Sequence, residues 1–428
     1  MALAAGSGGP LAIVLAGHAK LRNGLHRPQW RSSAIVLPTS RVQGKDAVVA
    51  SMIDDAAVAL LAERLRAPLQ IEQHLSPKTG EGYKQPMRDE AKSFAAVRQM
   101  PRIQLARHVP LSMPLIIYVE PTNRCNFGCR FCPESLPSYS TEAGGLRRLD
   151  LDSFKKICAD IKSLGRLKTL RFWMMGEPLL NKEVFAMIAH AKELDIADRT
   201  ELTTNGSALT PAAADAIIRS GLDYLRVSIY GMDPERHRIF TGSPISPERI
   251  AGNVAHLVAQ RRTIGAINPV VSVRMIEPGD VMEANQFVAA YSTLVDEVCI
   301  EASHNWNGYD ALDLKQRQHD GTTREATIEL PGRHPKEVCP SPFYVLVVHA
   351  DGEVGACCVD WSRKTSIGNI FRDSLADIWN GPRLRDFRRM HIERRREENE
   401  ACRHCDYLYQ FPDNLDEIRD ARILDVRA

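Results

Sequence analysis

Strand-like and helix-like segments alternate between residues 115 and 302, and this alternation restricts the fold more than any other feature of the chain. The apolar, strand-like segments are 115–120, 168–175, 199–204, 223–230, 269–276 and 296–302. The amphipathic, helix-like segments between most of them are 151–165, 181–195, 211–221, 247–263 and 281–294. This pattern is typical of a parallel sheet with right-handed crossovers. It predicts an α/β fold with a partial (β/α)6 barrel of the TIM type, whose active site lies at the carboxyl ends of the strands.

Three cysteines, Cys125, Cys129 and Cys132, directly follow the first predicted strand and therefore lie at the mouth of this barrel. Thiolates select zinc, copper(I) or iron-sulfur clusters, and the sequence has no histidine beside the triplet to complete a four-ligand zinc site. A four-iron cluster held by three thiolates leaves one iron open for a substrate or cosubstrate. The triplet therefore favours an iron-sulfur cluster over zinc.

The stretch 125-CNFGCRFC-132 resembles the C-x3-C-x2-C signature of radical S-adenosylmethionine (SAM) enzymes, including the aromatic residue before the last cysteine, here Phe131. The resemblance implies that the amino and carboxylate groups of SAM chelate the open iron. It also implies SAM contacts at the ends of later strands, where family-like segments follow in order. These contacts are Met175, Gly176 and Glu177 in 174-MMGEP-178, Thr204 and Asn205 in 203-TTNG-206, Ser228 in 227-VSIYG-231, and Met275 in 273-VRMIE-277.

The resemblance assigns a part of SAM to each segment. Glu177 and nearby carbonyls accept hydrogen bonds from the ammonium, although Met174 or Met175 stands where the family more often has a glycine. Thr204 and Asn205 belong to the ribose segment. Ser228 stands at the carboxylate position and Met275 near the adenine. Taken singly, each segment is equally compatible with an ordinary β/α loop.

A second cysteine set lies near the C-terminus and comprises Cys339, Cys357, Cys402 and Cys405. Four thiolates can hold a tetrahedral zinc ion or a complete [4Fe-4S] cluster, and the spacing alone leaves both open. The spacing resembles the short form of the SPASM domain, called Twitch, which follows radical SAM barrels. The resemblance implies one auxiliary [4Fe-4S] cluster without an open iron, which accepts or relays an electron.

The other cysteines and the end of the sixth strand supply further candidates. We expect Cys158 in the core and Cys358 as a buried neighbour of Cys357 that could replace it as a ligand. Cys299 either packs against its neighbours or faces the barrel lumen as a hydrogen-atom donor, and packing is the more frequent outcome. Glu301 or His304 is the candidate base. The segment 304-HNW-306 either contacts substrate or forms a loop anchored by a buried tryptophan.

The alternation of strand-like and helix-like segments ends after residue 302. We expect a mostly helical N-terminal extension of unknown function at 1–110, the barrel at 111–302, a linker at 303–338 and a small α+β cluster domain at 339–428. In the last part, residues 343–361 predict a hairpin that turns at Asp351-Gly352, followed by a helix around 374–391. Arginines alternate with glutamates in 385–400, which predicts a solvated helix face rather than a nucleic-acid patch.

The composition excludes several classes of partner. A net charge of +2 gives no reason to expect nucleic acid or an anionic membrane. The chain has no apolar run of ~18 residues, and 10-PLAIVLAGHA-19 is too short and lacks the basic start of a secretory signal. We therefore expect a cytoplasmic protein, in which clustered thiols bind metal rather than form disulfides.

These features together predict a radical SAM oxidoreductase. The family chemistry is reductive cleavage of SAM to a 5′-deoxyadenosyl radical, which removes hydrogen from a substrate C–H bond. We expect dehydrogenation or epimerisation of a sugar- or aminocyclitol-type small molecule in a biosynthetic pathway, with flavodoxin or ferredoxin as reductant. The alternatives are a radical SAM maturase of ribosomally made peptides and, in another class, a zinc-stabilised scaffold or binding module.

Overall fold

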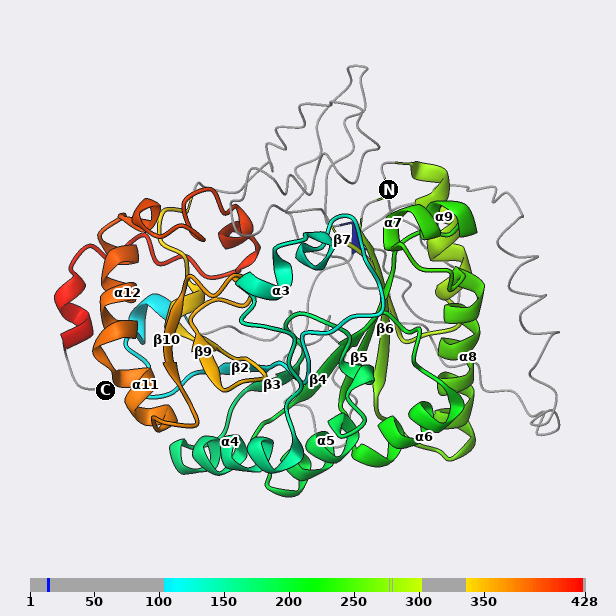
Figure 1. Ribbon diagram of the computed structural model, residues 1–428, viewed down its shortest axis with the longest axis horizontal. Coiled ribbons are helices and arrows are strands. Elements are labelled where there is room, and N and C mark those ends of the chain that lie inside the picture. The colour runs from blue at the N-terminus through cyan, green and yellow to red at the C-terminus, as the bar shows by residue number, and fades with distance from the viewer. Residues whose placement is uncertain (1–13, 16–103, 277, 279, 302–335, 426–428) are drawn as a thin grey trace, which may run out of the picture.

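The computed structural model describes residues 14–15, 104–276, 278, 280–301 and 336–425 (Figure 1). Within these residues one sheet contains all the strands, in the order β1-β7-β6-β5-β4-β3-β2-β8-β9-β10. The strands are β1 (Val14–Leu15), β2 (Ile116–Val119), β3 (Thr169–Phe172), β4 (Thr200–Thr204), β5 (Tyr224–Ile229), β6 (Val270–Ile276), β7 (Glu297–Glu301), β8 (Val345–Val348), β9 (Glu353–Gly355) and β10 (Ser366–Asn369). Neighbouring strands are parallel from β1 to β8 and antiparallel from β8 to β10.

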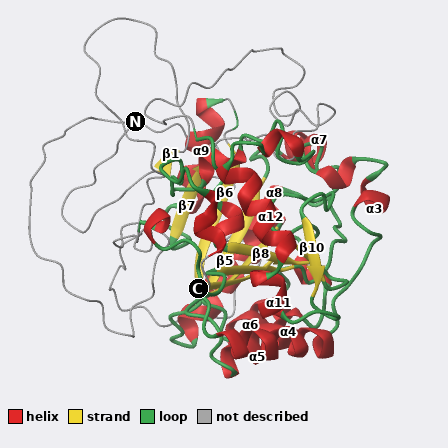
Figure 2. Ribbon diagram, turned by 90° about the vertical axis from the view of Figure 1, so that its left-hand side faces the viewer, coloured by secondary structure: helices red, strands yellow, loops and turns green. Residues whose placement is uncertain are grey.

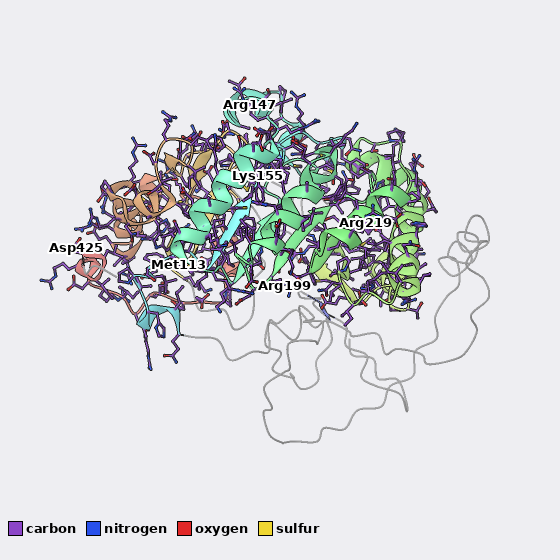
Figure 3. The ribbon with its side chains drawn as sticks, turned by 90° about the horizontal axis from the view of Figure 1, so that it is seen from below. Met113, Arg147, Lys155, Arg199, Arg219 and Asp425 are labelled. Atoms are coloured by element: carbon purple, nitrogen blue, oxygen red, sulfur yellow. The ribbon has the colours of Figure 1, made fainter. Side chains whose placement is uncertain are left out.

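The six predicted strands are β2 to β7, and the partial barrel is confirmed. The predicted helices between them are α4 (Leu151–Leu164), α5 (Val184–Glu193), α6 (Pro211–Ser220), α8 (Pro247–Thr263) and α9 (Val281–Tyr291). They surround the strands, which lie in the middle of the molecule (Figure 2). From below, α4 to α6 cover the outer face of the sheet, with Lys155 and Arg219 on their exposed sides (Figure 3).

Local sequence sets where these helices begin. The side chains of Asp150, Thr210 and Ser246 each accept a hydrogen bond from a backbone N–H in the first turn of α4, α6 and α8. Proline occupies the first position of α6 and α8, where its missing N–H costs nothing. The helices therefore start directly after their capping residues.

Side chains alternate along the strands between an apolar outer face and a polar inner face. On β5, Leu225, Val227 and Ile229 belong to the hydrophobic core, whereas Tyr224 and Arg226 lie on the opposite, inner face. The Tyr224 hydroxyl donates to Glu297 of β7 at 2.6 Å. The barrel interior is thus rich in charge and the main core lies between the sheet and its helices.

Strand β8 extends the barrel sheet instead of starting a separate one. It pairs in parallel with β2 over four residue pairs, from Ile116 with Val345 to Val119 with Val348. The predicted hairpin is present, because β8 and β9 are antiparallel and Gly352 takes the left-handed conformation at the turn, with φ +81°. Sequence reasoning missed β10, whose four residues lack an alternating apolar pattern.

The predicted helix around 374–391 is wrong in one respect, because it consists of α11 (Leu375–Asn380) and α12 (Pro382–Ile392). The helix is interrupted at Gly381, which is extended, and Pro382 has no N–H to continue α11.

The solvated helix face predicted for 385–400 is also wrong in part. Arg388 is buried, lies 4.0 Å from the centre of the Trp379 ring and donates to the Pro342 carbonyl at 2.9 Å.

Several predictions fall outside the described residues. These are the helical extension up to residue 103, the linker up to residue 335, and the segment 304-HNW-306 with the candidate base His304. In the part of the chain that the structure describes, no helix has the length and apolarity needed to cross a membrane.

Replacing Trp379 by alanine is expected to lower the free energy of unfolding by about 3–5 kcal/mol. The ring is fully buried, stacks with Arg388 and donates from Nε1 to the Leu111 carbonyl at 2.8 Å. Chemical denaturation measures the change. The control is Phe371→Ala, at a ring that is 42% exposed, with an expected loss below about 1 kcal/mol; equal losses would contradict the role given to Trp379.

Candidate radical and auxiliary cluster sites

The cysteine triplet occupies the loop that leaves β2 at the carboxyl edge of the sheet. Cys129 is buried and Cys125 and Cys132 are half-buried. The Cys132 N–H donates to the Cys129 carbonyl at 2.8 Å and folds the loop into a turn. Burial, followed by the nearby Glu134 carboxyl, raises the pKa of Cys132 to about 12. The thiols become thiolates here only if a cation compensates for their burial, as bound iron does.

Helix α7 (Pro234–Thr241) holds this loop through hydrogen bonds, and this helix was not predicted from the sequence. Its last carbonyls, at Phe240 and Thr241, accept hydrogen bonds from the N–H groups of Arg130 and Gly128 at 2.9 and 2.8 Å. The carbonyls at a helix end need such partners. The signal was present in the sequence, because Asp233 caps the first turn and proline follows it directly.

A cleft next to this loop joins two predicted SAM contacts. Phe131 and Met275 both line it, together with Tyr230, whose ring centre is 5.2 Å from that of Phe131. An ion pair between Arg236 and Glu283, at 3.0 Å, forms part of its wall. The two predicted SAM contacts thus lie on one small cleft, and the contact of Met275 with adenine stays a prediction.

Glu177 joins the ends of β3 and β4. Its buried carboxylate accepts hydrogen bonds from the Thr204 hydroxyl and the Asn205 N–H, both at 2.7 Å, and from the Leu179 N–H at 3.0 Å. Burial raises the pKa of Glu177 and these three bonds oppose the rise. Both carboxylate oxygens thus hold the loops, and its contact with the SAM ammonium stays a prediction.

Gly176 allows the β3 loop to approach the cysteine loop. It has φ +74°, and a Cβ atom there would lie 2.4 Å from the Thr122 carbonyl oxygen. The Glu177 N–H donates to the Arg124 carbonyl at 2.8 Å across the same contact. Met175, the departure from the family pattern, is buried and its N–H donates to Glu120 at 3.3 Å. The glycine that this geometry requires is therefore the one at position 176.

Asn205 and Ser228 contact other parts of the site. The Asn205 amide donates to Asn126 at 3.0 Å and lies 3.9 Å from the Cys125 sulfur. The Ser228 hydroxyl accepts from Arg274 Nε at 3.2 Å. The structure thus gathers the predicted SAM contacts around one mouth, and it adds Asn126 and Arg274, which the motif comparison did not include.

The second cysteine set lies at the other side of the sheet, beyond β8. Burial raises the pKa of Cys339 to about 12 and that of Cys357 well above its usual value. The other three thiols of the set each raise the pKa of Cys357 further, so the four lie close together. Arg396 donates to the carbonyls of Cys402 and Cys405 at 2.7 and 3.1 Å and holds their turn.

The remaining cysteines separate into three environments. Cys158 is fully buried in the core, as expected. Cys358 is hydrogen-bonded to Tyr118 on the barrel side, and its charge also raises the pKa of Cys357 and of Cys339, so its exclusion from the ligand set stays a prediction. Cys299 is 7% exposed, and the strand alternation places it on the inner face with Glu297 and Glu301. Cys299 is thus both buried and on the inner face of the sheet, and its role as a hydrogen-atom donor stays a prediction.

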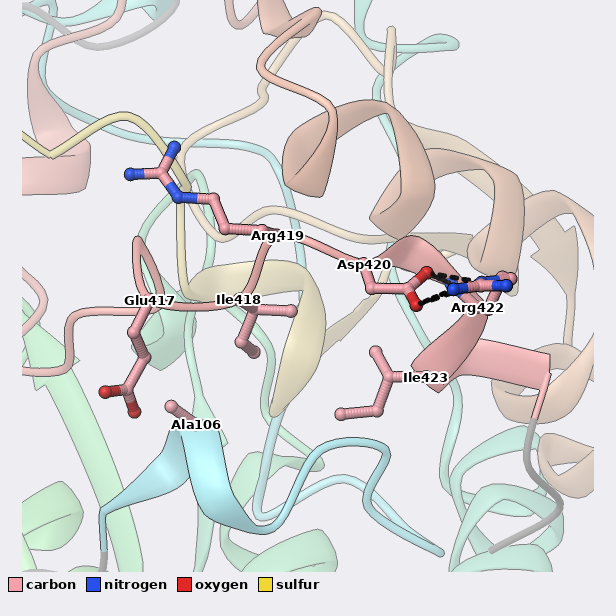
Figure 4. Close-up of a pocket in the computed structure, with 7 residues that line it drawn as sticks. All are labelled: Ala106, Glu417, Ile418, Arg419, Asp420, Arg422 and Ile423. Carbon is pink, nitrogen blue, oxygen red and sulfur yellow. Dashed lines mark hydrogen bonds and ion pairs between the residues drawn. The ribbon is translucent and has the colours of Figure 1, made fainter.

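Both thiol sets suit clusters with several irons. In the described residues, no three His, Cys, Asp or Glu side chains converge closely enough to hold one metal ion. Each thiolate of a [4Fe-4S] cluster binds a different iron, so its thiolates need not converge on a point. A more voluminous cleft of ≈ 680 Å³ holds none of the predicted site residues; it is lined by Ala106, Glu417, Ile418, Arg419, Asp420, Arg422 and Ile423, and Arg422 pairs with Asp420 in its wall (Figure 4).

Two family matches decide the assignment. Residues 119–279 match the radical SAM superfamily, and residues 339–406 match the SPASM iron-sulfur cluster-binding domain. The chain belongs to the radical SAM superfamily. It is therefore an enzyme whose cofactors are SAM, a SAM-binding [4Fe-4S] cluster and an auxiliary [4Fe-4S] cluster. The triplet cysteines fit the first cluster and the second cysteine set fits the auxiliary one.

Individual relatives of this radical SAM enzyme have different activities. The tungsten-containing aldehyde ferredoxin oxidoreductase cofactor-modifying protein of Pyrococcus furiosus is 26% identical over 64% of this chain and 82% of its own. The SAM-dependent 2-deoxy-scyllo-inosamine dehydrogenase of Niallia circulans is 22% identical over 68% and 92%. The structure of Streptococcus suis SuiB bound to SAM shares the fold, with TM-score 0.51 and 17% identity over 71% and 73%.

Gly176→Ala is expected to remove the SAM-binding cluster and to leave the auxiliary one, because the new Cβ atom collides with the backbone before Cys125. Purified protein should fall from about eight irons per chain to about four. The control is Gly145→Ala, also at positive φ, where a Cβ atom meets only the Arg147 side chain at 3.5 Å. A Gly176→Ala protein with the full iron content and normal SAM cleavage would refute this account of the glycine.

Proposed function

We propose that the enzyme dehydrogenates or epimerises a polar, hydroxyl-rich small molecule of the sugar or aminocyclitol type. The observation that carries the proposal is the polar lining of the barrel behind the SAM motifs. Charged and hydroxylated side chains occupy the inner positions of β3 to β7, namely Arg171, Arg199, Glu201, Thr203, Tyr224, Arg226, Ser228, Ser272, Arg274, Glu297 and Glu301. A lumen of this kind offers hydrogen bonds to hydroxyl and amino groups rather than an apolar surface.

The end of the lumen near the mouth is organised around Arg274. Its guanidinium contacts Ser228 and forms an ion pair with Glu301 at 2.8 Å. The Thr203 hydroxyl oxygen is buried and has no hydrogen-bond partner within the described residues. A buried hydroxyl without a partner is costly in an empty site and is satisfied when a polar ligand binds.

The auxiliary region reaches the same lumen. Burial raises the pKa of Cys358 to about 11, and its hydrogen bond with Tyr118 of β2 and the charge of Arg171 of β3 oppose this rise. Burial also raises the pKa of Tyr407, two residues after the ligand Cys405, and the nearby Cys358 and Glu301 add to this rise. An electron acceptor next to the lumen favours a net oxidation, and the similarity to a 2-deoxy-scyllo-inosamine dehydrogenase supports the same class of substrate.

The residues of the chain then have distinct tasks. Bound SAM and its cluster supply the 5′-deoxyadenosyl radical, which takes one hydrogen atom from a carbinol carbon. Glu301 accepts the hydroxyl proton, and the ion pair with Arg274 at 2.8 Å orients this carboxylate. With the auxiliary cluster bound, that site would accept the remaining electron, so that an alcohol would become a ketone through loss of a hydrogen atom, a proton and an electron. The buried lumen excludes water from the radical.

Replacing Cys125, Cys129 and Cys132 together by alanine is expected to abolish SAM cleavage and to leave about four irons in the auxiliary site. Anaerobic purification, iron analysis and chromatography of 5′-deoxyadenosine measure both. The matched control replaces Cys158 and Cys299, which is expected to preserve both clusters. A colourless protein with zinc would instead support the scaffold alternative, and 5′-deoxyadenosine formed by the triple variant would contradict the assigned ligand set.

Glu301→Gln is expected to slow substrate oxidation by about 10²–10⁴-fold, the usual contribution of a general base. SAM cleavage should persist, because the proposal assigns Glu301 to the substrate and not to the SAM or cluster contacts. The measurement uses C-deuterated sugars and aminocyclitols and follows deuterium transfer into 5′-deoxyadenosine. Transfer from peptides and from none of these small molecules would favour the maturase alternative, and equal product formation by the variant would exclude Glu301 as the base.

A further inference from the structure

The auxiliary cysteine set contains a buried histidine beside one of its thiols. His391 of α12 is 1% exposed, and its Nε2 atom lies 3.9 Å from the Sγ atom of Cys402. Nδ1 is also buried and has no hydrogen-bond partner among the described residues. In this part of the chain the Cys402 sulfur is therefore the hydrogen-bond partner of the imidazole.

The neighbouring side chains hold the ring in this orientation. Phe387, one turn earlier on α12, meets the imidazole edge to face, with ring centres 4.9 Å apart and an interplanar angle of 77°. Arg396 donates to the Cys402 carbonyl at 2.7 Å and keeps that thiol next to the histidine. Neither contact uses an imidazole nitrogen, so both leave Nε2 directed at sulfur.

The chemistry of the ligand sets the direction of the hydrogen bond. A thiolate bound to iron has no proton, so its sulfur can only accept. A neutral imidazole carries one N–H, and it must be on Nε2 for this contact to be favourable. Metal ligands are commonly supported by such partners outside the coordination sphere, and hydrogen bonds to the sulfurs tune the reduction potential of iron-sulfur clusters.

We infer that His391 donates a hydrogen bond from Nε2 to the Cys402 thiolate and raises the reduction potential of the auxiliary cluster. Reduction adds negative charge that spreads onto the sulfurs, so a donor stabilises the reduced cluster more than the oxidised one. His391 is thus a tuning residue and Cys402 remains the ligand. The inference rests on the auxiliary cluster. Under the proposed function, the hydrogen bond from His391 makes that cluster a better acceptor for the substrate electron.

The test measures the potential of the auxiliary cluster alone. In a background with Cys125, Cys129 and Cys132 replaced by alanine, a redox titration followed by electron paramagnetic resonance reports one cluster. His391→Phe removes the donor and keeps a ring of similar size. We expect a tenfold less favourable one-electron reduction, about 59 mV more negative. His391→Gln keeps an N–H donor and should stay closer to the parent protein.

The control is Phe387→Leu, which loosens the packing of the same ring and removes no donor, so it should shift the potential by less than His391→Phe does. An unchanged potential in His391→Phe would overturn the inference, and so would an equal shift in Phe387→Leu. Loss of the auxiliary iron in His391→Phe alone would overturn it in favour of an iron ligand. No substrate enters the titration, so its result is independent of whether the enzyme acts on sugars or aminocyclitols.

Discussion

Both metal sites depend on the pairing of β2 with β8. The cysteine triplet leaves the end of β2, and the hairpin that starts with β8 leads to Cys357. A buried contact joins the carboxyl ends of the two strands, where His349 Nδ1 lies 3.3 Å from Glu120 Oε2. The same carboxylate accepts from the N–H groups of Met175 and Ala350, each at 3.3 Å. One buried glutamate therefore connects the SAM motif, the cysteine loop and the auxiliary region.

The charge in the barrel interior follows from the different roles of the two faces of the sheet. The outer face carries the apolar packing that stabilises the fold, so the inner face is free to bind a ligand. Burying charge is costly unless it is paired, and the structure pairs it. Arg171 and Arg199 both lie 2.9 Å from Glu201. These ion pairs fix side chains in place before a substrate arrives, which limits the ordering that binding requires.

The sequence predicted the barrel well because each unit is locally consistent. The strands are short apolar runs, and the helices have capping residues such as Asp150 and Ser246 at their starts. The motif order also predicted that the segments with Glu177, Thr204 and Asn205 lie at the same mouth, whereas the hydrogen bonds from Thr204 and Asn205 to Glu177 are a finding of the structure. These relations depend on strand order, which the alternation of segments already implies.

What the sequence did not predict depends on contacts between distant segments. Helix α7 is eight residues long and polar, and its importance lies in two carbonyls that the cysteine loop uses. The parallel pairing of β8 with β2 joins strands more than 200 residues apart, and no local pattern encodes it. Arg388 carries the sequence signature of a surface residue, and its burial is explained by the Trp379 ring and by the carbonyls of Pro342 and Trp379, to which it donates.

The two cysteine sets differ in the number of thiols that they offer to a cluster, and this difference bears on the task of each set. The triplet has three thiols and lies beside a cleft lined by Phe131 and Met275, so a cosubstrate can complete the ligands of its cluster. The second set has four thiols, and Arg396 and His391 occupy the space around Cys402. Under the proposed function, this set leaves no iron for a substrate to bind. Cys358, next to Cys357, is hydrogen-bonded to Tyr118 of the barrel and connects the auxiliary region with the lumen. The same proposal places bond cleavage and electron acceptance on opposite sides of one pair of strands.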